Sequence, residues 1–223
     1  MADNDDTLFP SSDRTQGPFL RRVRIKNYKS IGKCELDLAS VNVLVGRNGA
    51  GKSNFLDALS FVVDSFPTSL DPAIKARGGI DAVRRYSTGH PRNFAIELHL
   101  DLPSFRTAVY GFEIAARGQG KFVVKYEILR ITDLSKSEKA YYEVIEGVLR
   151  GSSEKVTPPV MSDRLSLVTM SNLPEFRTIY DALFSMGFYN LNPNIMKKPQ
   201  SPDAGELLHR DGSNIAGVIG RIR

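Results

Sequence analysis

The sequence predicts a mixed α/β fold in which a glycine-rich loop opens a helix and a series of antiparallel strands follows. Three observations predict this fold. Residues 46–53, GRNGAGKS, fit the pattern G-x-x-x-x-G-K-[S/T] of a phosphate-binding P-loop. Apolar residues recur at helical spacing directly after this loop, and apolar and polar residues alternate in several later segments. The chain of 223 residues is long enough for one or two domains.

Two strands are expected directly before the loop. Residues 34–38 alternate like a strand with one buried face. Residues 41–45 form a short apolar run rich in β-branched valines, which predicts a fully buried strand. Strand, glycine loop and helix in this order are the context that a P-loop requires.

Each position of the loop has a chemical reason. Glycine lacks a Cβ and adopts the dihedral angles that let consecutive backbone N–H groups converge on one anion. The helix that follows adds unpaired N–H groups and a dipole that favours negative charge. Lys52 would reach the β- and γ-phosphates of a nucleotide, and the Ser53 hydroxyl would be a ligand of Mg²⁺. The residues expected to bind the nucleotide are Gly46, Arg47, Asn48, Gly49, Ala50, Gly51, Lys52, Ser53 and Asn54.

The elements after the loop follow from periodicity and from the positions of glycine and proline. The first helix has an apolar face made of Phe55, Ala58, Leu59, Val62 and Phe66. Gly78 and Gly79 separate two short helices. The expected elements are helices at 52–66, 72–76 and 80–86, strands at 94–100, 108–115, 122–131, 141–149 and 164–170, and a helix at 174–186.

Composition indicates a cytoplasmic protein that does not contact a membrane. Hydrophobic content of 41% and charged content of 25% are ordinary for a globular chain. No apolar run approaches the length of about 18 residues that a membrane span needs, and no apolar signal segment opens the chain. Cys34 is the only cysteine, which excludes an intramolecular disulfide. The three histidines lack metal-ligand spacing, so no metal other than Mg²⁺ is expected.

Charge is unevenly placed along the chain. The net charge of +5 and the pI of 9.3 favour an acidic partner. Residues 1–18 carry four aspartates among proline and serine residues, and this leader is expected to be disordered. A basic stretch follows it, made of Arg21, Arg22, Arg24, Lys26, Lys29 and Lys33. This stretch is a candidate DNA surface, and the alternative is a strand whose wet face carries lysine and arginine.

Residues 48–59, NGAGKSNFLDAL, resemble the loop and helix of ABC-type ATPases of the SMC and RecF kind. Transporter ATPases usually have threonine at the position of Asn54. Residues 20–31, LRRVRIKNYKSI, resemble the opening strand and turn of the same ATPases. Later segments are similar to predicted bacterial AAA-family ATPases related to the OLD nucleases and to phage-defence ATPases; they are residues 78–85, 94–100, 188–193 and 211–216.

This resemblance implies a P-loop NTPase head of the ABC-ATPase type, with an antiparallel β-subdomain beside its core. It implies ATP and Mg²⁺ as ligands, and ATP-driven engagement of two heads in DNA repair, DNA maintenance or phage defence. The implied divisions are a leader at 1–18, a core at 19–66, a β-subdomain and lid at about 67–170, and a helical segment at about 171–223.

Four elements of such a head are not found in the sequence. They are the Walker B strand ending in Asp-Glu, the Ser-Gly signature motif, the switch histidine and a convincing Q-loop glutamine. The chain is therefore expected to be the N-terminal half of a head that needs a homodimer or a second chain carrying the other half. ATP hydrolysis is implied by resemblance alone, and no catalytic residue is assigned.

Two other functions remain open. A P-loop kinase acting on a small molecule would need a lid with catalytic arginines and a complete compact fold. The expected strands before the loop and the long antiparallel stretch after it argue against a kinase. A nucleotide sensor that does not hydrolyse would explain the missing hydrolytic elements.

Overall fold

The computed structural model describes residues 19–87, 92–104, 106–133, 135, 137–155, 157–199 and 207–222. The expected leader at 1–18 lies outside this range. The described residues up to Phe184 belong to one compact unit, and Ser185–Arg223 belong to a second. None of the helices in the described part is long and apolar enough to cross a membrane.

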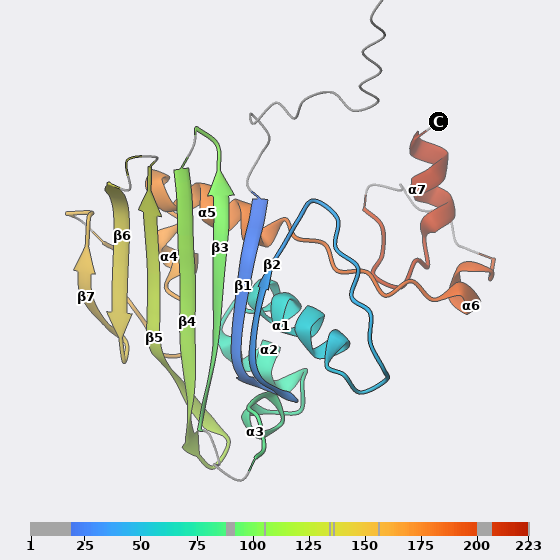
Figure 1. The fold of residues 1–223 in the computed structure, drawn as a ribbon, viewed down its shortest axis with the longest axis horizontal. Helices are drawn as coiled ribbons and strands as arrows, with labels where there is room; N and C mark the ends of the chain where they lie inside the picture. The colour runs from blue at the N-terminus through green and yellow to red at the C-terminus, as the bar shows by residue number, and fades with distance from the viewer. Residues whose placement is uncertain are drawn as a thin grey trace, which may run out of the picture. The chain divides into compact units, whose positions relative to one another are not determined.

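The first unit is built on one seven-stranded sheet in which every neighbouring pair is antiparallel (Figure 1). The spatial order of the strands is β2-β1-β3-β4-β5-β6-β7, so the chain moves across the sheet from β3 onward by successive hairpins. The strands are β1 Phe19–Tyr28, β2 Ile31–Asp37, β3 Asn93–Leu102, β4 Arg106–Gly118, β5 Lys121–Thr132, β6 Glu138–Ile145 and β7 Val148–Ser152. The expected antiparallel strands at 94–100, 108–115 and 122–131 are confirmed.

The helices of this unit cover one face of the sheet (Figure 1). They are α1 Lys52–Asp64, α2 Leu70–Lys75, α3 Ile80–Val83, α4 Leu167–Met170 and α5 Pro174–Phe184. The predicted apolar face of α1 is confirmed, because Phe55, Ala58, Leu59 and Val62 are buried. Phe66 is buried as well, but it lies two residues beyond the end of the helix. The second unit holds α6 Pro193–Met196 and α7 Ile215–Ile222.

The core lies between the sheet and these helices. Strand β3 alternates fully, so Phe94, Ile96 and Leu98 are buried while the residues between them face outward. Three rings meet edge to face, with centroids 5.5 Å apart for Tyr28 and Phe94 and 5.4 Å apart for Phe61 and Phe94. Such contacts add to the hydrophobic stabilisation of a core. They join the P-loop helix α1 to strands β1 and β3.

The predictions of two strands are wrong. Residues 141–149 contain a hairpin, because Glu146 and Gly147 adopt positive φ values of 48° and 76° and turn the chain from β6 to β7. Residues 164–170 contain the short helix α4. Its first turn is stabilised by a distant carboxylate, which a local sequence pattern does not reveal.

The expected buried strand at 41–45 is also wrong. These residues run without regular secondary structure, and Val41, Val43 and Val45 are 80%, 79% and 89% exposed. A strand needs a neighbour to complete its backbone hydrogen bonds, and none of the strands in the described part pairs with this segment. An apolar sequence therefore predicts burial only where something is present to bury it.

Candidate nucleotide-binding site

The glycine loop leads directly into the N-terminus of α1. Gly49 and Gly51 have φ values of 82° and 93°, in the left-handed region that favours glycine. A Cβ on Gly49 would meet no atom within 4 Å. Glycine is therefore favoured at this position by the backbone conformation and not by lack of space for a side chain. Gly51 precedes the first residue of the helix, Lys52. The loop and helix therefore have the local geometry that the motif predicts.

The N-terminus of α1 has no counter-charge of its own. Gly51 supplies no side-chain cap, and the first turn contains no acidic residue. The first helical bond is donated by the Phe55 N–H to the Gly51 carbonyl at 2.9 Å. The N–H groups at the start of a helix lack helical partners and carry partial positive charge, so this end of α1 suits an anion.

Lys52 folds back over the loop. Its Nζ donates to the Gly46 carbonyl at 2.6 Å and to the Arg47 carbonyl at 2.9 Å. The ammonium group thus lies against the loop, where a bound phosphate could replace the carbonyl oxygens as its acceptor. Ser53, the expected magnesium ligand, is exposed, and so is Arg47.

The P-loop helix is fixed to the turn between β1 and β2. Asn54 Nδ2 donates to Ser30 Oγ at 2.7 Å. One turn further along α1, the Asp57 carboxylate accepts hydrogen bonds from Tyr28 Oη at 2.7 Å and Arg77 Nε at 3.0 Å, and it forms an ion pair with Lys29 Nζ at 2.6 Å. We call these four residues the Asp57 clamp.

Burial disfavours the charge on Asp57, but the hydrogen bonds from Lys29 and Tyr28 and the charge of Arg77 outweigh it and hold the pKa of Asp57 below its ordinary value. Burial and the Asp57 carboxylate together raise the pKa of Tyr28. Arg77 is 7% exposed, and its guanidinium lies 5.3 Å from the centre of the Phe61 ring. The sequence motif gave no role to Asp57 or Arg77, because their contacts join residues far apart in the chain.

An open hollow of about 500 Å³ lies beside the loop. Strand β2 contributes Cys34 and Leu36, α1 contributes Phe55, and the exposed segment before the loop contributes Val43 and Leu44. Burial raises the pKa of the Cys34 thiol, which disfavours its reactive thiolate form. The hollow exposes apolar side chains that a further element of structure could cover.

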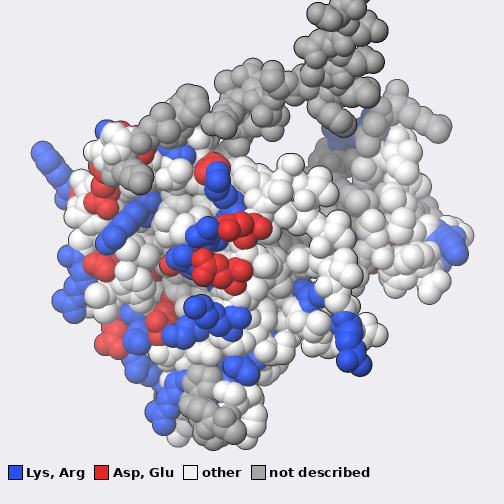
Figure 2. Space-filling view, in the orientation of Figure 1, with Lys and Arg blue, Asp and Glu red and all other residues white. Residues whose placement is uncertain are grey.

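Most of the expected basic stretch is neutralised. Arg21 pairs with Asp101 at 3.1 Å, and Arg22 pairs with Asp37. Arg24 pairs with both Glu35 and Glu97 at 2.9 Å, and Lys29 belongs to the Asp57 clamp. Figure 2 shows the result, a band of alternating basic and acidic side chains on the face toward the viewer. The stretch as a whole is therefore not a continuous basic surface.

The two histidines in the described part of the chain do not form a metal site. His99 Nε2 lies 2.7 Å from the Glu97 carboxylate, and His209 Nδ1 lies 3.0 Å from Ser213 Oγ. His90 lies outside the described residues. No cluster of His, Cys, Asp and Glu suited to a metal ion occurs among the residues that the structure describes.

A glycine loop at a helix N-terminus, with a lysine folded over it, is the arrangement that nucleotide-binding P-loop proteins share. Residues 19–142, more than half of the chain, match the family model described as an AAA ATPase domain. The chain belongs to this family. The match confirms the ATPase family that the resemblance implied, and with it the mixed α/β ATPase fold class.

Three known proteins show partial similarity. An ATP/GTP phosphatase of Helicobacter pylori (strain ATCC 700392 / 26695) is 34% identical over 67 residues, which are 30% of this chain and 17% of that protein. The recombination mediator RecF in complex with ATP has a TM-score of 0.36 and 17% identity, over 55% of this chain and 28% of that chain. A structure from work on ATP-driven dimerization and DNA-stimulated activation of SMC ATPases has a TM-score of 0.31 and 16% identity, over 92% and 91% of the two chains.

Proposed function

We propose that this chain binds Mg²⁺-ATP through residues 46–54. The observation that carries the proposal is the uncapped start of α1 behind two glycines of positive φ, with Lys52 folded over the loop. The free N–H groups and the Lys52 ammonium would neutralise the phosphates, and the exposed Ser53 hydroxyl fits a magnesium ligand. Bound Mg²⁺ would neutralise developing charge on the terminal phosphates.

The proposed biological role is that of a RecF/SMC/OLD-like ATPase head in the cytoplasm, acting in DNA repair, DNA maintenance or phage defence. Residues 19–66 would form the nucleotide core, about 67–170 the β-subdomain and lid, and about 171–223 a helical segment. ATP would drive engagement of two heads, in a homodimer or with a second chain that supplies the Walker B half. The exposed valines at 41–45 support a partner element, because large exposed apolar patches usually mark an interaction surface.

Isothermal titration calorimetry with ATP tests the nucleotide site. Lys52→Ala removes the main phosphate charge partner, and we expect ATP affinity to fall by roughly tenfold or more. Ser53→Ala should weaken binding of Mg²⁺-ATP more than binding of ATP with EDTA. Both residues lie in the first turn of α1 and neither side chain is buried, so thermal unfolding should change little. Equal ATP affinity of the wild type and Lys52→Ala would show that nucleotide binds elsewhere or not at all.

A further inference from the structure

The outer face of β1 and β2 carries three cross-strand pairs of charged residues. Two of them join opposite charges: Arg22 lies opposite Asp37, and Arg24 lies opposite Glu35. The third joins like charges, because Lys26 lies opposite Lys33. Opposite charges directly across an antiparallel pair stabilise a sheet, whereas like charges destabilise it. The Lys26–Lys33 pair therefore departs from the pattern of its own hairpin and weakens the sheet.

The neighbouring strands do not neutralise these two lysines. On its other side Lys26 lies opposite Ala95 of β3, which carries no charge. The next residue across the sheet is Glu113 of β4, opposite Ala95. Its carboxylate already accepts hydrogen bonds from Asn93 and, at 3.0 Å, from Lys125. Within the part of the chain that the structure describes, neither Lys26 nor Lys33 forms a close ion pair. The charge of Lys33 does act on Glu35, two residues away on β2, but that carboxylate is bonded to Arg24.

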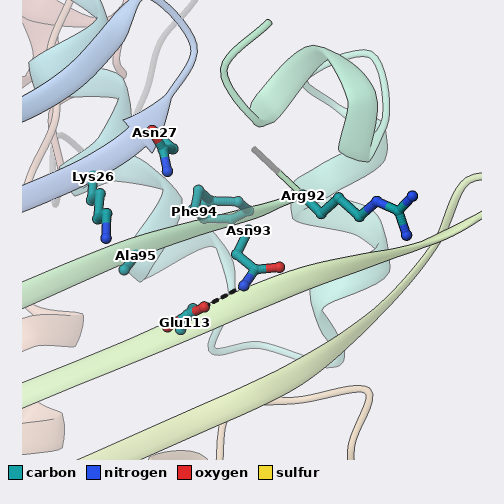
Figure 3. Close-up of a pocket in the computed structure, with 7 residues that line it drawn as sticks. All are labelled: Lys26, Asn27, Arg92, Asn93, Phe94, Ala95 and Glu113. Carbon is teal, nitrogen blue, oxygen red and sulfur yellow. Dashed lines mark hydrogen bonds between the residues drawn. The ribbon is translucent and has the colours of Figure 1, made fainter. Parts of the chain in front are cut away.

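Two shallow hollows meet at Lys26. One, of about 320 Å³, is lined by Lys26, Lys33 and Ala95. Arg24, Glu35 and Glu97 also line it, and Arg24 forms ion pairs with both glutamates. The other, of about 330 Å³, lies toward β4 and is lined by Lys26, Asn27, Asn93 and Glu113. Figure 3 shows Lys26 extending from β1 toward Ala95 and Glu113, and Asn93 bonded to Glu113. The small Ala95 side chain leaves the Lys26 ammonium accessible from both hollows.

We propose that Lys26 and Lys33 bind the phosphodiester backbone of nucleic acid. This inference rests on the nucleic-acid partner of the proposed function, and it names where that partner binds. Two adjacent ammonium groups that form no close ion pair would release condensed cations from a polyanion, which is the main source of affinity in sequence-independent binding. The paired arginines of the same hairpin contribute little, because their charge is already neutralised by Asp37, Glu35 and Glu97.

Fluorescence anisotropy with a short labelled DNA duplex tests the site in the full chain. The wild type should bind with an affinity that falls as salt rises. The double variant Lys26→Gln/Lys33→Gln should bind roughly tenfold more weakly at 0.1 M salt, and its slope of log affinity against log salt should be smaller by about two units. The charge-preserving variant Lys26→Arg/Lys33→Arg should bind like the wild type.

The matched control is Lys121→Gln/Lys155→Gln, which removes the same charge from exposed lysines elsewhere. Equal loss of affinity in the control would show that only the net charge of the chain matters, and it would overturn the site. Absence of DNA binding by the wild type would also overturn it. Competition by inorganic phosphate at concentrations that leave ionic strength unchanged would identify a small-anion site instead. ATP titration of the wild type separates the two proposals. A wild type that binds DNA through these lysines but does not bind ATP would contradict the P-loop function and leave this site standing.

A second readout follows from the like-charge pair itself. Lys33→Glu places a carboxylate opposite Lys26 and restores the pattern of the two preceding pairs. We expect this variant to unfold at a higher temperature than the wild type while losing DNA affinity. A lower unfolding temperature together with retained DNA affinity would contradict both the electrostatic cost and the proposed binding role.

Discussion

Single residues of the candidate site differ in how far the sequence could predict them. Lys52 and Ser53 could be named from the sequence because phosphate binding requires them at fixed spacing after the glycines. Asp57 lies in the same helix, but its partners Tyr28, Lys29 and Arg77 come from β1, from the following turn and from the segment after α2. Only the folded chain brings them together, so no local pattern could predict the clamp.

The Asp57 clamp predicts a pH-dependent stability. Asp57→Asn keeps the size of the side chain, but its amide nitrogen can only donate. Either the Tyr28 hydroxyl or the Arg77 guanidinium therefore loses its acceptor, because they bond to different oxygens of Asp57. We expect a loss of about 2 kcal/mol in the free energy of unfolding near neutral pH, because hydrogen bonds to a charged group are removed. Urea unfolding followed by circular dichroism measures this loss.

The sign of the pH effect follows from the lowered pKa of Asp57. The folded protein binds fewer protons at this group than the unfolded chain, so its contribution is present above about pH 4 and disappears as the pH falls through the lowered pKa. The difference between the wild type and Asp57→Asn should therefore shrink at about pH 3. The control Asp71→Asn breaks an exposed ion pair with Lys75 and should change stability little at either pH. A difference that does not depend on pH would exclude the clamp as its cause.

At the scale of elements, helix α4 depends on a carboxylate from the sheet. Glu127 of β5 is fully buried, and it accepts hydrogen bonds from the backbone N–H groups of Ser166 and Leu167. The hydroxyl groups of Tyr110 and Tyr142 donate to the same carboxylate at 3.1 Å and 2.9 Å. Burial raises the pKa of Glu127 despite these donors. Glu127 thus joins three strands to the start of a helix.

Glu127→Gln should destabilise this connection. The glutamine amide nitrogen must face either the Ser166 or the Leu167 N–H, and two donors cannot bond to each other. We expect a loss of about 2 kcal/mol in the free energy of unfolding, the cost of an unsatisfied buried group. Glu143→Gln is the matched control, since Glu143 accepts from Tyr126 in a partly exposed position. Equal stability of the two variants in urea would contradict the role assigned to Glu127.

The elements show where alternation predicts strands correctly and where it fails. Alternation predicted β3, β4 and β5 because one face of this sheet is buried and the other is wet. Residues 164–170 are apolar enough for a strand, but the Glu127 carboxylate satisfies the N–H groups of a helix there. Residues 41–45 have a strand composition without a strand neighbour. For both segments, the presence or absence of contacts with residues far away in the sequence decided the secondary structure.

At the scale of the whole molecule, we expect the isolated chain to hydrolyse ATP negligibly. Hydrolysis needs a group that orients or activates water beside the metal-bound nucleotide. Asp57, the carboxylate nearest to the loop along the chain, is engaged by Tyr28, Lys29 and Arg77, and its lowered pKa makes it a weak base. A phosphate-release assay measures turnover. Steady turnover that disappears in Lys52→Ala would contradict this expectation and would favour a catalytic carboxylate in the chain or the kinase alternative.

The exposed segment before the P-loop predicts association of the isolated chain. Val43 and Val45 are 79% and 89% exposed, and Leu44 lines the hollow beside the loop. Exposed apolar side chains next to unpaired backbone favour contact with another chain. Light scattering should show that the wild type self-associates as its concentration rises, and Val43→Lys/Val45→Lys should reduce this association without loss of folding. The control Met161→Lys/Leu207→Lys adds the same charge at other exposed apolar positions and should associate like the wild type. A wild type that stays monomeric at high concentration would count against a partner at this surface, because the apolar segment would then be stable in water on its own.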